Sequence, residues 1–454
     1  MKHILLIGAG RSATTLIDYL LEQAERLDWF IRLGDRDETL AQEKIKGSSR
    51  ATAFGMDVKN TEQLIIEIRQ ADVVISMLPA FMHLQVAELC VEYRKHLVTA
   101  SYVSEDMKKL NEKAEQNGVL LLNEIGLDPG IDHMSAMKLI HHIKDEGHKI
   151  EAFESFTGGL LAPESEKGNP WKYKFTWNPR NVVLAGQGGS VKFLHNGRHK
   201  YIPPYRLFRR TEILDIEGFG KFEGYANRDS LSYINIYGLQ GTPTVYRGTL
   251  RRVGFCRAWH IFVMLGATDD SYVMEDIKDM TYREFINSFL PYNPNDSVEL
   301  KLMQYLHIDQ DSDIMEKLRW SGIFSDKRIG LESATPAQIL EKILMDKWKM
   351  DSDDRDMIAM LHKLIYFDGV SYRKILSHMV IEGKDSIHTG MAQTVGLPVG
   401  VATKLILEGV IREKGVQIPV KPEIYEPVLK ELEHYGIQFI EQDEICEIEA
   451  ERTI

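Results

Sequence analysis

The sequence predicts an α/β fold, with a doubly wound parallel sheet first and a mixed-sheet α+β region carrying a small helical insert after it. Three observations predict it. Over residues 1–130, short β-branched runs alternate with amphipathic stretches, the pattern of a parallel sheet with helices on both faces. From about Ile150, strand-like segments lie among Gly, Pro and aromatic loops. Residues 281–349 then consist of short amphipathic segments.

The N-terminal region alternates six predicted strands with five predicted helices. Two of its runs, Val73–Ile75 and Val119–Leu122, are unbroken and apolar, as in strands buried on both faces. The predicted strands are His3–Gly8, Phe30–Asp35, Ala51–Met56, Asp72–Leu78, His96–Ala100 and Val119–Asn123. The predicted helices are Ser12–Leu27, Asp37–Ile45, Thr61–Arg69, Met82–Tyr93 and Ser104–Asn117.

The remainder of the chain has a less regular pattern, typical of a sheet that carries long functional loops. The predicted strands are Ile150–Thr157, Val182–Ala185, Gly220–Gly224, Thr244–Arg252, Met357–Tyr366 and Tyr372–Glu382. The predicted helices are Tyr282–Leu290, Ser297–Leu306, Asp313–Trp320, Pro336–Trp348, Met391–Glu408 and Glu423–Tyr435.

These patterns divide the chain into four predicted parts. The first domain covers residues 1–130, and a mixed-sheet substrate domain covers residues 131–280 and 350–390. A helical insert covers residues 281–349, and C-terminal helices in residues 391–454 are expected to pack near the first domain.

The composition is that of an ordinary globular protein, with 44% hydrophobic and 27% charged residues. A formal net charge of −12 argues against a nucleic-acid surface but leaves room for a locally basic site. No stretch reaches the ~18 consecutive apolar residues that a membrane helix needs. The apolar run at Met1–Gly8 is too short for a signal peptide and predicts the first strand.

Three cysteines, Cys90, Cys256 and Cys446, have neither disulfide nor metal spacing. We therefore expect a cytoplasmic protein with reduced thiols and no bound metal. We also expect a homodimer that has no membrane or nucleic-acid partner.

A glycine motif directly follows the first predicted strand. Gly8-Ala9-Gly10-Arg11-Ser12-Ala13 fits G-x-G-x-x-G/A and opens a predicted helix. Gly8 makes the tight turn, Gly10 lets the backbone approach a pyrophosphate, and Ala13 lets the helix pack on the strand. The helix N-terminus supplies amide donors. In this context the motif predicts a Rossmann domain that binds a nicotinamide dinucleotide.

The end of the second strand bears on the choice of cofactor. Asp35 holds the position at which an acidic residue usually accepts hydrogen bonds from the adenosine ribose, which favours NAD(H). Arg36 beside it can pair with a 2′-phosphate, which leaves NADP(H) open. A surface turn closed by the two residues is the structural alternative. The sequence favours NAD(H).

Polar residues follow several later strands, where ligands bind in open α/β sheets. We expect Asp57 to reach the adenine, Leu78 and Pro79 to line the nicotinamide ribose, and Tyr102 to face a substrate. Any Rossmann domain carries polar residues at its strand ends, so this pattern is not specific by itself.

The run Glu124–His133 is more specific. Two glycines and a proline predict a sharp turn at the edge of the cofactor site that projects Asp128 into it. Asp132 is a plausible N-cap of the helix that follows. Asp132 and His133 are equally well explained as helix-capping or turn residues.

This run, together with Thr99–Ser104 before it, resembles the saccharopine dehydrogenase family, specifically its glutamate-forming branch, saccharopine reductase. The resemblance continues through most of the chain, in the family's order. The matching segments are Phe156–Leu160, Ala162–Glu164, Tyr173–Trp177, Asn227–Ser230, Arg247–Arg251, Val395–Pro398 and Leu405–Gly409. Related carboxynorspermidine and homospermidine enzymes match the middle of the chain less well.

The resemblance implies an oxidoreductase of lysine metabolism. It would interconvert saccharopine with L-glutamate and 2-aminoadipate semialdehyde by hydride transfer to or from NAD(P) and imine hydrolysis. The implied cofactor residues are Gly8, Gly10, Arg11, Ser12, Ala13, Asp35, Arg36, Asp37, Asp57, Val58, Leu78, Leu127, Asp128 and Pro129. The implied saccharopine residues are Ser101, Tyr102, Asp128, Arg228, Thr249, Leu250 and Arg251.

The sequence departs from the family pattern at two positions. Thr157 stands where fungal members have a cysteine before the Gly-Gly pair, so no catalytic thiol is expected. Asp35 puts the family's NADP preference in doubt.

The chemistry of saccharopine supports the assignment, because a molecule with three carboxylates calls for fixed guanidinium groups. Arg228 and Arg251 are the predicted carboxylate clamp, and a surface ion pair of Arg228 with Asp229 is the alternative. Asp128 or Tyr102 is expected to handle protons, and His133 is a weaker candidate.

Two other classes of function remain open on sequence. One is a different amine dehydrogenase, either carboxynorspermidine-type or lysine-forming. The other is a non-catalytic NAD-binding protein, because a fold alone does not establish an activity.

Overall fold

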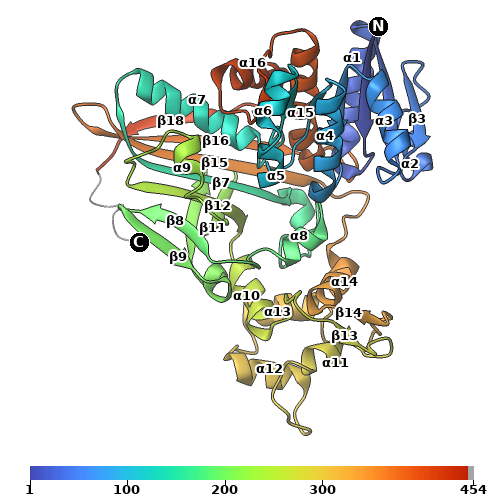
Figure 1. Ribbon diagram of the computed structural model, residues 1–454. Helices are drawn as coiled ribbons and strands as arrows, with labels where there is room; N and C mark the ends of the chain where they lie inside the picture. The colour runs from blue at the N-terminus through green and yellow to red at the C-terminus, as the bar shows by residue number, and fades with distance from the viewer. Residues whose placement is uncertain (448–454) are drawn as a thin grey trace. The chain divides into compact units, whose positions relative to one another are not determined.

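The computed structural model describes residues 1–447, which form two compact units (Figure 1). Unit 1 comprises Met1–His148 and Ile387–Ile440, and unit 2 comprises Lys149–Ser386 and, among the described residues, 441–447. Unit 1 contains a parallel sheet and unit 2 a mixed sheet, so the predicted fold class is confirmed.

The sheet of unit 1 has seven parallel strands in the order β17-β6-β5-β4-β1-β2-β3 within the described residues. They are β1 (Lys2–Ile7), β2 (Trp29–Asp35), β3 (Ala51–Gly55), β4 (Val73–Ser76), β5 (His96–Val98), β6 (Leu120–Leu122) and β17 (Gly415–Gln417). The chain reverses direction across the sheet between β1 and β4. Ligands of such sheets bind outside the carboxyl ends of the strands at this reversal.

Helices cover both faces of this sheet. Leu5 and Ile7 face a core that includes α3 and α4, and alternate residues point to the opposite side, where α1 and α15 pack. The helices are α1 (Thr14–Arg26), α2 (Glu38–Lys44), α3 (Thr61–Gln70), α4 (His83–Glu92), α5 (Glu105–Lys108), α6 (Asn111–Gln116), α7 (Ile131–Asp145), α15 (Gly390–Leu407) and α16 (Pro422–Leu432). Three short 3-10 turns are η1 (Arg11–Ala13), η2 (Ala80–Met82) and η5 (Glu433–Tyr435).

Helix α15 packs on α1 through two glycines. A Cβ at Gly396 would lie 2.9 Å from the Leu16 backbone nitrogen, and one at Gly400 would lie 2.6 Å from the Tyr19 ring. By length and composition α15 could cross a membrane, but 78% of it is buried within the structure. Its apolar character is that of a core helix.

Unit 1 extends past the boundary predicted at residue 130. Helix α7 packs on α16, where the Tyr425 hydroxyl lies 2.8 Å from His141 Nδ1. Of the predicted C-terminal part, residues 391–454, the described residues 391–447 are divided between the units, and residues 448–454 lie outside the described residues. The described part supplies α15, β17 and α16 to unit 1 and β18 (Ile440–Ile445) mainly to unit 2.

The sheet of unit 2 has nine strands among the described residues, in the order β10-β11-β12-β7-β15-β16-β18, with β8 beside β12 and β9 beside β8. The other strands are β7 (Lys149–Leu161), β8 (Val191–His195), β9 (Arg198–Ile202), β10 (Thr211–Ile216), β11 (Gly220–Ala226), β12 (Thr244–Arg252), β15 (Asp356–Phe367) and β16 (Tyr372–Glu382). β7 and β12 pair in parallel, whereas β11 with β12 and β7 with β15 are antiparallel.

Unit 2 also contains the helical insert, seen as the yellow and orange group α11 to α14 in Figure 1. An aromatic core that includes Trp171, Trp259 and Trp348 joins the insert to the sheet. The helices and short strands are η3 (Pro163–Glu166), α8 (Pro179–Val183), η4 (Pro204–Arg209), α9 (Tyr233–Ile236), α10 (Phe255–Leu265), β13 (Met274–Glu275), α11 (Tyr282–Asn287), α12 (Val298–Leu306), α13 (Asp313–Trp320), β14 (Ser333–Ala334) and α14 (Pro336–Trp348).

The strand predicted at Val182–Ala185 is wrong, because this segment belongs to α8 and the turn after it. The Asn178 side chain caps the helix by accepting a hydrogen bond from the Arg180 amide at 3.0 Å. Pro179 occupies the first turn, where its fixed φ suits a helix. The helix-starting effect of Asn178 and Pro179 therefore outweighs the strand preference of Val182 and Val183.

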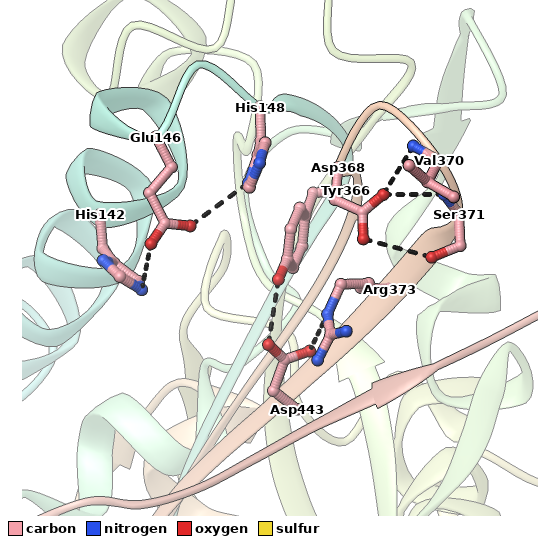
Figure 2. Close-up of polar contacts among 9 residues, drawn as sticks. All are labelled: His142, Glu146, His148, Tyr366, Asp368, Val370, Ser371, Arg373 and Asp443. Carbon is pink, nitrogen blue, oxygen red and sulfur yellow. Dashed lines mark hydrogen bonds and ion pairs between the residues drawn. The ribbon is translucent and has the colours of Figure 1, made fainter.

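Strand β18 is held to the edge of its sheet by Asp443. This carboxylate accepts a hydrogen bond from the Tyr366 hydroxyl at 3.0 Å, and Arg373 Nε lies 3.1 Å from its other oxygen (Figure 2). The side chains of β18 are exposed, so strand pairing and these contacts, rather than burial, hold it in place.

Weak acid is expected to destabilise unit 1. Burial lowers the pKa of His83 and of His96 to about 4, whereas a histidine in an unfolded chain has a pKa near ~6.5. Between these values the unfolded chain binds more protons than the folded one. This contribution to stability is therefore complete above about pH 6.5 and is lost as the pH falls toward 4. His96 Nδ1 accepts the Leu120 amide at 3.0 Å, and protonation removes that acceptor.

Urea unfolding at neutral pH and in weak acid measures this loss. The His96→Gln variant should lose less stability on acidification than the wild type. His142→Gln is the control, because the His142 side chain is 62% exposed and pairs with Glu146 at the surface (Figure 2). Equal acid sensitivity of His96→Gln and wild type would contradict the prediction.

Candidate active site

The loop after β1 has the shape that the glycine motif predicts. Gly8 has φ +105°, and a Cβ there would lie 2.9 Å from a backbone carbonyl oxygen, so this turn requires glycine. A Cβ at Gly10 would meet nothing within 4 Å, which leaves open space beside the backbone. Ala13 is buried, whereas Arg11 is exposed and Ser12 is half-buried in the turn that precedes α1. The loop fits the pyrophosphate of a dinucleotide.

The Asp35 carboxylate is turned toward the glycine loop. It accepts hydrogen bonds from the Ala9 amide at 2.6 Å and from the Asp37 amide at 2.9 Å. Asp37 in turn caps α2 by accepting the Leu40 amide. Asp35 thus has backbone partners of its own, and Arg36 next to it is exposed.

Lys44 is a residue at this loop that the sequence analysis did not identify. Its Nζ donates to the Gly10 carbonyl and to the Thr14 hydroxyl, each at 2.8 Å. Burial lowers the pKa of Lys44 to about 8, while the nearby carboxylates of Asp18 and Asp35 act in the opposite direction. A lysine in a surface helix carries no motif, so only the fold reveals this contact.

The remaining cofactor residues predicted on the early strand ends have different surroundings. The Asp57 side chain is exposed and accepts the Lys59 amide at 3.0 Å. The Val58 side chain is buried in the core, so only its backbone lies at the sheet edge. Leu78 is half-buried against the same core.

Asp128 and Tyr102 form a pair. The Tyr102 hydroxyl donates to Asp128 Oδ1 at 2.9 Å, and the Tyr102 ring is 38% exposed. Gly130 closes the loop behind Asp128, where a Cβ would lie 2.1 Å from the Gly126 carbonyl oxygen. The Gly126 amide donates to the Pro129 carbonyl at 2.9 Å. This loop therefore holds Asp128 on a fixed backbone.

Glu124 and His133 lie behind that loop. Glu124 accepts the Val103 amide at 2.9 Å, and its other oxygen lies 2.8 Å from His133 Nε2. His133 is fully buried, and Asp132 accepts the Gly130 amide at 2.6 Å. Asp132 and His133 therefore both make contacts that stabilise the loop.

Ser101 lies in the segment that follows β5, one residue before Tyr102. Its hydroxyl is 2.7 Å from His83 Nε2, and His83 Nδ1 is 2.8 Å from the Ser76 hydroxyl. His83 is a second residue that the sequence analysis missed, because a lone histidine at a helix start gives no pattern to recognise.

In unit 2, Arg228 lies in the turn after β11. It has φ +44° and is exposed, and its carbonyl accepts the Lys192 amide at 2.9 Å. Asp229 lies 3.7 Å from Lys192 Nζ, so this acid has a partner other than Arg228.

Thr249, Leu250 and Arg251 are consecutive on β12 and therefore alternate between the two faces of the sheet. The Leu250 side chain is buried in an apolar core with Phe156, so its contribution to a polar site is limited to its backbone. Thr249 and Arg251 share the other face. There, Thr249 lies opposite Tyr225 of β11 and beside Thr157 of β7.

Arg251 is buried in a cage of aromatic rings. Its guanidinium carbon lies 5.1 Å from the Tyr173 ring centre, 5.4 Å from that of Phe255 and 6.0 Å from that of Tyr225. Nη1 donates to the Leu250 carbonyl at 2.9 Å, whereas Nε has no hydrogen-bond partner among the described residues. Burial raises the pKa of Tyr173 to about 12, so its hydroxyl stays neutral.

The predicted substrate residues thus lie in both units. Unit 1 brings together Ser101, Tyr102 and Asp128 near the carboxyl ends of its strands, and unit 2 places Thr249 and Arg251 on one face of β12. Among the described residues, no group of three or more His, Cys, Asp or Glu is arranged to hold a metal ion.

Comparisons with known proteins match both units. A family model described as "Saccharopine dehydrogenase NADP binding domain" matches residues 4–122. A second model, described as "Saccharopine dehydrogenase C-terminal domain", matches residues 126–437. Together they cover most of the chain.

Curated relatives agree with these models. The chain is 32% identical to "Saccharopine dehydrogenase [NADP(+), L-glutamate-forming]" of Schizosaccharomyces pombe, over 97% of this chain and 99% of that protein. It is 31% identical to the mitochondrial alpha-aminoadipic semialdehyde synthase of Rattus norvegicus. It spans about half of that longer protein, 48% of its length.

A solved structure is similar over the whole chain. The apo saccharopine dehydrogenase (L-Glu forming) from Saccharomyces cerevisiae has a TM-score of 0.87 and 32% identity, over 98% of this chain and 100% of that chain. The homospermidine synthase of Legionella pneumophila has a TM-score of 0.55 at 11% identity, which is a likeness of fold alone.

These comparisons contradict the predicted preference for NAD(H), because the matching domain and the fungal relatives are named for NADP. The structure gives the physical reason. Asp35 was expected to accept hydrogen bonds from a ribose, but its two oxygens accept backbone amides of the glycine loop and of Asp37. The adjacent Arg36 is exposed and suited to a 2′-phosphate.

Proposed function

This chain belongs to the saccharopine dehydrogenase family, and we propose that it interconverts saccharopine with L-glutamate and 2-aminoadipate semialdehyde, using NADP(H). The observation that carries the proposal is the Tyr102–Asp128 pair near the carboxyl ends of a parallel sheet that bears a dinucleotide loop. A proton-handling pair at this place matches a reaction in which a secondary amine is oxidised.

The residues of unit 1 fit the cofactor. Gly10 leaves open space where any other side chain would stand, and the first turn after it presents backbone amides to a phosphate. Arg36 would hold the 2′-phosphate through its planar, always charged guanidinium. When bound, the nicotinamide ring supplies the hydride acceptor.

The residues of the chain have distinct roles in the oxidative direction. The secondary ammonium of saccharopine must lose a proton before its carbon can be oxidised, and Asp128 takes this proton directly or through water. Tyr102 fixes the orientation of the Asp128 carboxylate by its 2.9 Å hydrogen bond. The imine left on the substrate adds water and collapses to the two products, and the same pair returns a proton to the nitrogen.

The substrate carboxylates need cationic anchors, which unit 2 supplies. Arg251 is a buried guanidinium that no carboxylate pairs with among the described residues. An unpaired buried charge is costly, and a substrate carboxylate would neutralise it. We propose that Arg251, Thr249 and the exposed Arg228 bind carboxylates of saccharopine.

Absorbance of NADPH tests the function. Saccharopine with NADP⁺ should produce NADPH, and mass spectrometry should identify glutamate and the semialdehyde as products. Lysine with 2-oxoglutarate as products would instead assign the chain to the lysine-forming branch. Oxidation of carboxynorspermidine in place of saccharopine would indicate the polyamine branch. Cofactor binding without turnover of any of these amines would indicate a non-catalytic protein.

Replacing Arg36 tests the cofactor assignment. Arg36→Ala should raise KM for NADPH relative to NADH by roughly tenfold to more than a hundredfold, because a hydrogen bond to a charged group contributes about 1.5–3 kcal/mol. Arg50→Ala is the matched control. Arg50 directly precedes β3, and its guanidinium pairs with Asp28. An unchanged ratio of the two KM values would assign the 2′-phosphate to another residue.

We also propose that the protein works in the cytoplasm as a homodimer. The three cysteines are few and lack disulfide spacing, a pattern typical of proteins in a reducing compartment. Light scattering coupled to size exclusion measures the oligomeric state, and a monomer at working concentration would contradict the dimer.

A further inference from the structure

A buried histidine links two strand ends of unit 1. His83 is the first residue of α4 and is 3% exposed. One ring nitrogen, Nδ1, lies 2.8 Å from the hydroxyl of Ser76, the last residue of β4. The other, Nε2, lies 2.7 Å from the hydroxyl of Ser101 after β5. The hydrogen bonds of Ser76, His83 and Ser101 therefore form a continuous series from the core of the sheet to the proposed substrate site.

The His83 imidazole is neutral at neutral pH, since burial lowers the pKa of His83 to about 4. A neutral imidazole has one N–H donor and one lone-pair acceptor. One of the two serine hydroxyls must therefore donate to the ring, and the other must accept from it. The direction of both hydrogen bonds is fixed by the serine whose hydroxyl proton has no acceptor other than His83.

Ser76 decides the direction. Its side chain is fully buried, and His83 Nδ1 is the only hydrogen-bond partner of its hydroxyl among the described residues. A buried hydroxyl proton without an acceptor would cost about 1–3 kcal/mol. Ser76 therefore donates to Nδ1, and the ring proton lies on Nε2. Thr99 is 3.4 Å from the same Nε2, a long and weak contact that does not compete with Ser101.

Ser101 consequently accepts a hydrogen bond from His83, and its own proton is directed away from the ring. Ser101 is half-buried and adjoins Tyr102 of the proton-handling pair. The proton of a hydroxyl fixed in this way is free to donate, so the hydroxyl suits a carboxylate of the substrate.

We propose that His83 is a positioning residue whose fixed Nε2–H tautomer makes Ser101 a hydrogen-bond donor to a carboxylate of the amino-acid substrate. The proposal rests on the proposed function for the identity of that substrate. The donor role of Ser101 then depends on His83, which is almost closed to solvent.

Nitrogen NMR of histidine-labelled protein tests the tautomer without any enzyme assay. Two-bond proton–nitrogen spectra should show His83 with its proton on Nε2, assigned by the signals that disappear in His83→Phe. Ser76→Ala removes the fixed donor and should give a mixture of tautomers. Ser321→Ala, which removes another buried hydroxyl in unit 2, should leave the His83 signals unchanged. An Nδ1–H tautomer in the wild type would overturn the proposal.

Kinetics test the role of Ser101. Ser101→Ala should raise KM for saccharopine roughly tenfold or more while KM for NADPH changes little. His83→Phe should raise the same KM by less, because Ser101 remains but is no longer oriented. A rise only in KM for NADPH would make the cofactor the partner of Ser101 and overturn the proposal. A wild type that turns over no saccharopine would refute the proposed function and the substrate assignment together, while the NMR result still decides the tautomer.

Discussion

Replacing Asp128 by Asn is expected to lower kcat for saccharopine oxidation by about 10²–10⁴-fold, the range that a positioned general base contributes. The amide has the shape of the carboxylate, and its oxygen can still accept the Tyr102 hydroxyl, so the loop keeps its geometry. The group that takes the ammonium proton is lost. Steady-state NADPH absorbance at saturating saccharopine measures the effect.

A pH profile separates this role from simple binding. The defect of Asp128→Asn should shrink as the pH rises, because the free amine then forms in solution without a base. Asp106→Asn is the control, since Asp106 is exposed on α5 and pairs with Lys109 at 2.7 Å. If kcat of Asp128→Asn stays within about threefold of the wild-type value at neutral pH, Asp128 is not the group that takes the proton. Tyr102→Phe would then test the other member of the pair.

Local patterns in the sequence were sufficient for much of this fold. The predicted bounds of β12, α13, α14 and β16 match those in the structure, since each has a clear apolar period and a turn or capping residue at its ends. The glycine loop was predictable for the same reason. Gly8 and Gly10 follow a strand and open a helix, and their roles are local.

Contacts between distant segments could not be predicted in this way. β17 joins the sheet beside β6, although residues 149–386 of unit 2 lie between the two strands in the sequence. The aromatic cage of Arg251 needs Tyr173 and Phe255 at once, and no spacing rule connects them. Asp35 was placed at the correct strand end, but the orientation of its carboxylate depends on the Ala9 amide of another loop.

The second large effect concerns the proposed carboxylate clamp in unit 2. Arg228→Ala and Arg251→Ala should each lower kcat/KM for saccharopine by roughly tenfold to more than a hundredfold, because a charge-assisted hydrogen bond contributes about 1.5–3 kcal/mol. Affinity for NADPH, measured by fluorescence titration, should stay nearly unchanged. Arg228→Lys should recover only part of the loss, since a point charge does not reproduce the planar guanidinium.

The two alanine variants should differ in stability. Arg228 is exposed in a turn, so its replacement should change the free energy of unfolding little. The Arg251 side chain fills a cage of three rings, and its removal leaves a cavity. The expected loss is about 2–5 kcal/mol, as for other large buried side chains cut to alanine. Urea unfolding of both variants measures the difference.

Arg251→Met separates binding from packing, because methionine adapts to irregular gaps and carries no charge. If Arg251 serves only to pack against Tyr173 and Phe255, this variant should keep both its stability and its kcat/KM. We expect it instead to stay folded and to lose saccharopine turnover. The guanidinium is buried without a carboxylate partner among the described residues, and such a charge is costly unless an anion arrives to pair with it. If kcat/KM for saccharopine stays within about threefold of the wild-type value in both Arg251→Met and Arg228→Ala, the proposed clamp is wrong. The carboxylates of the substrate are then held by other residues.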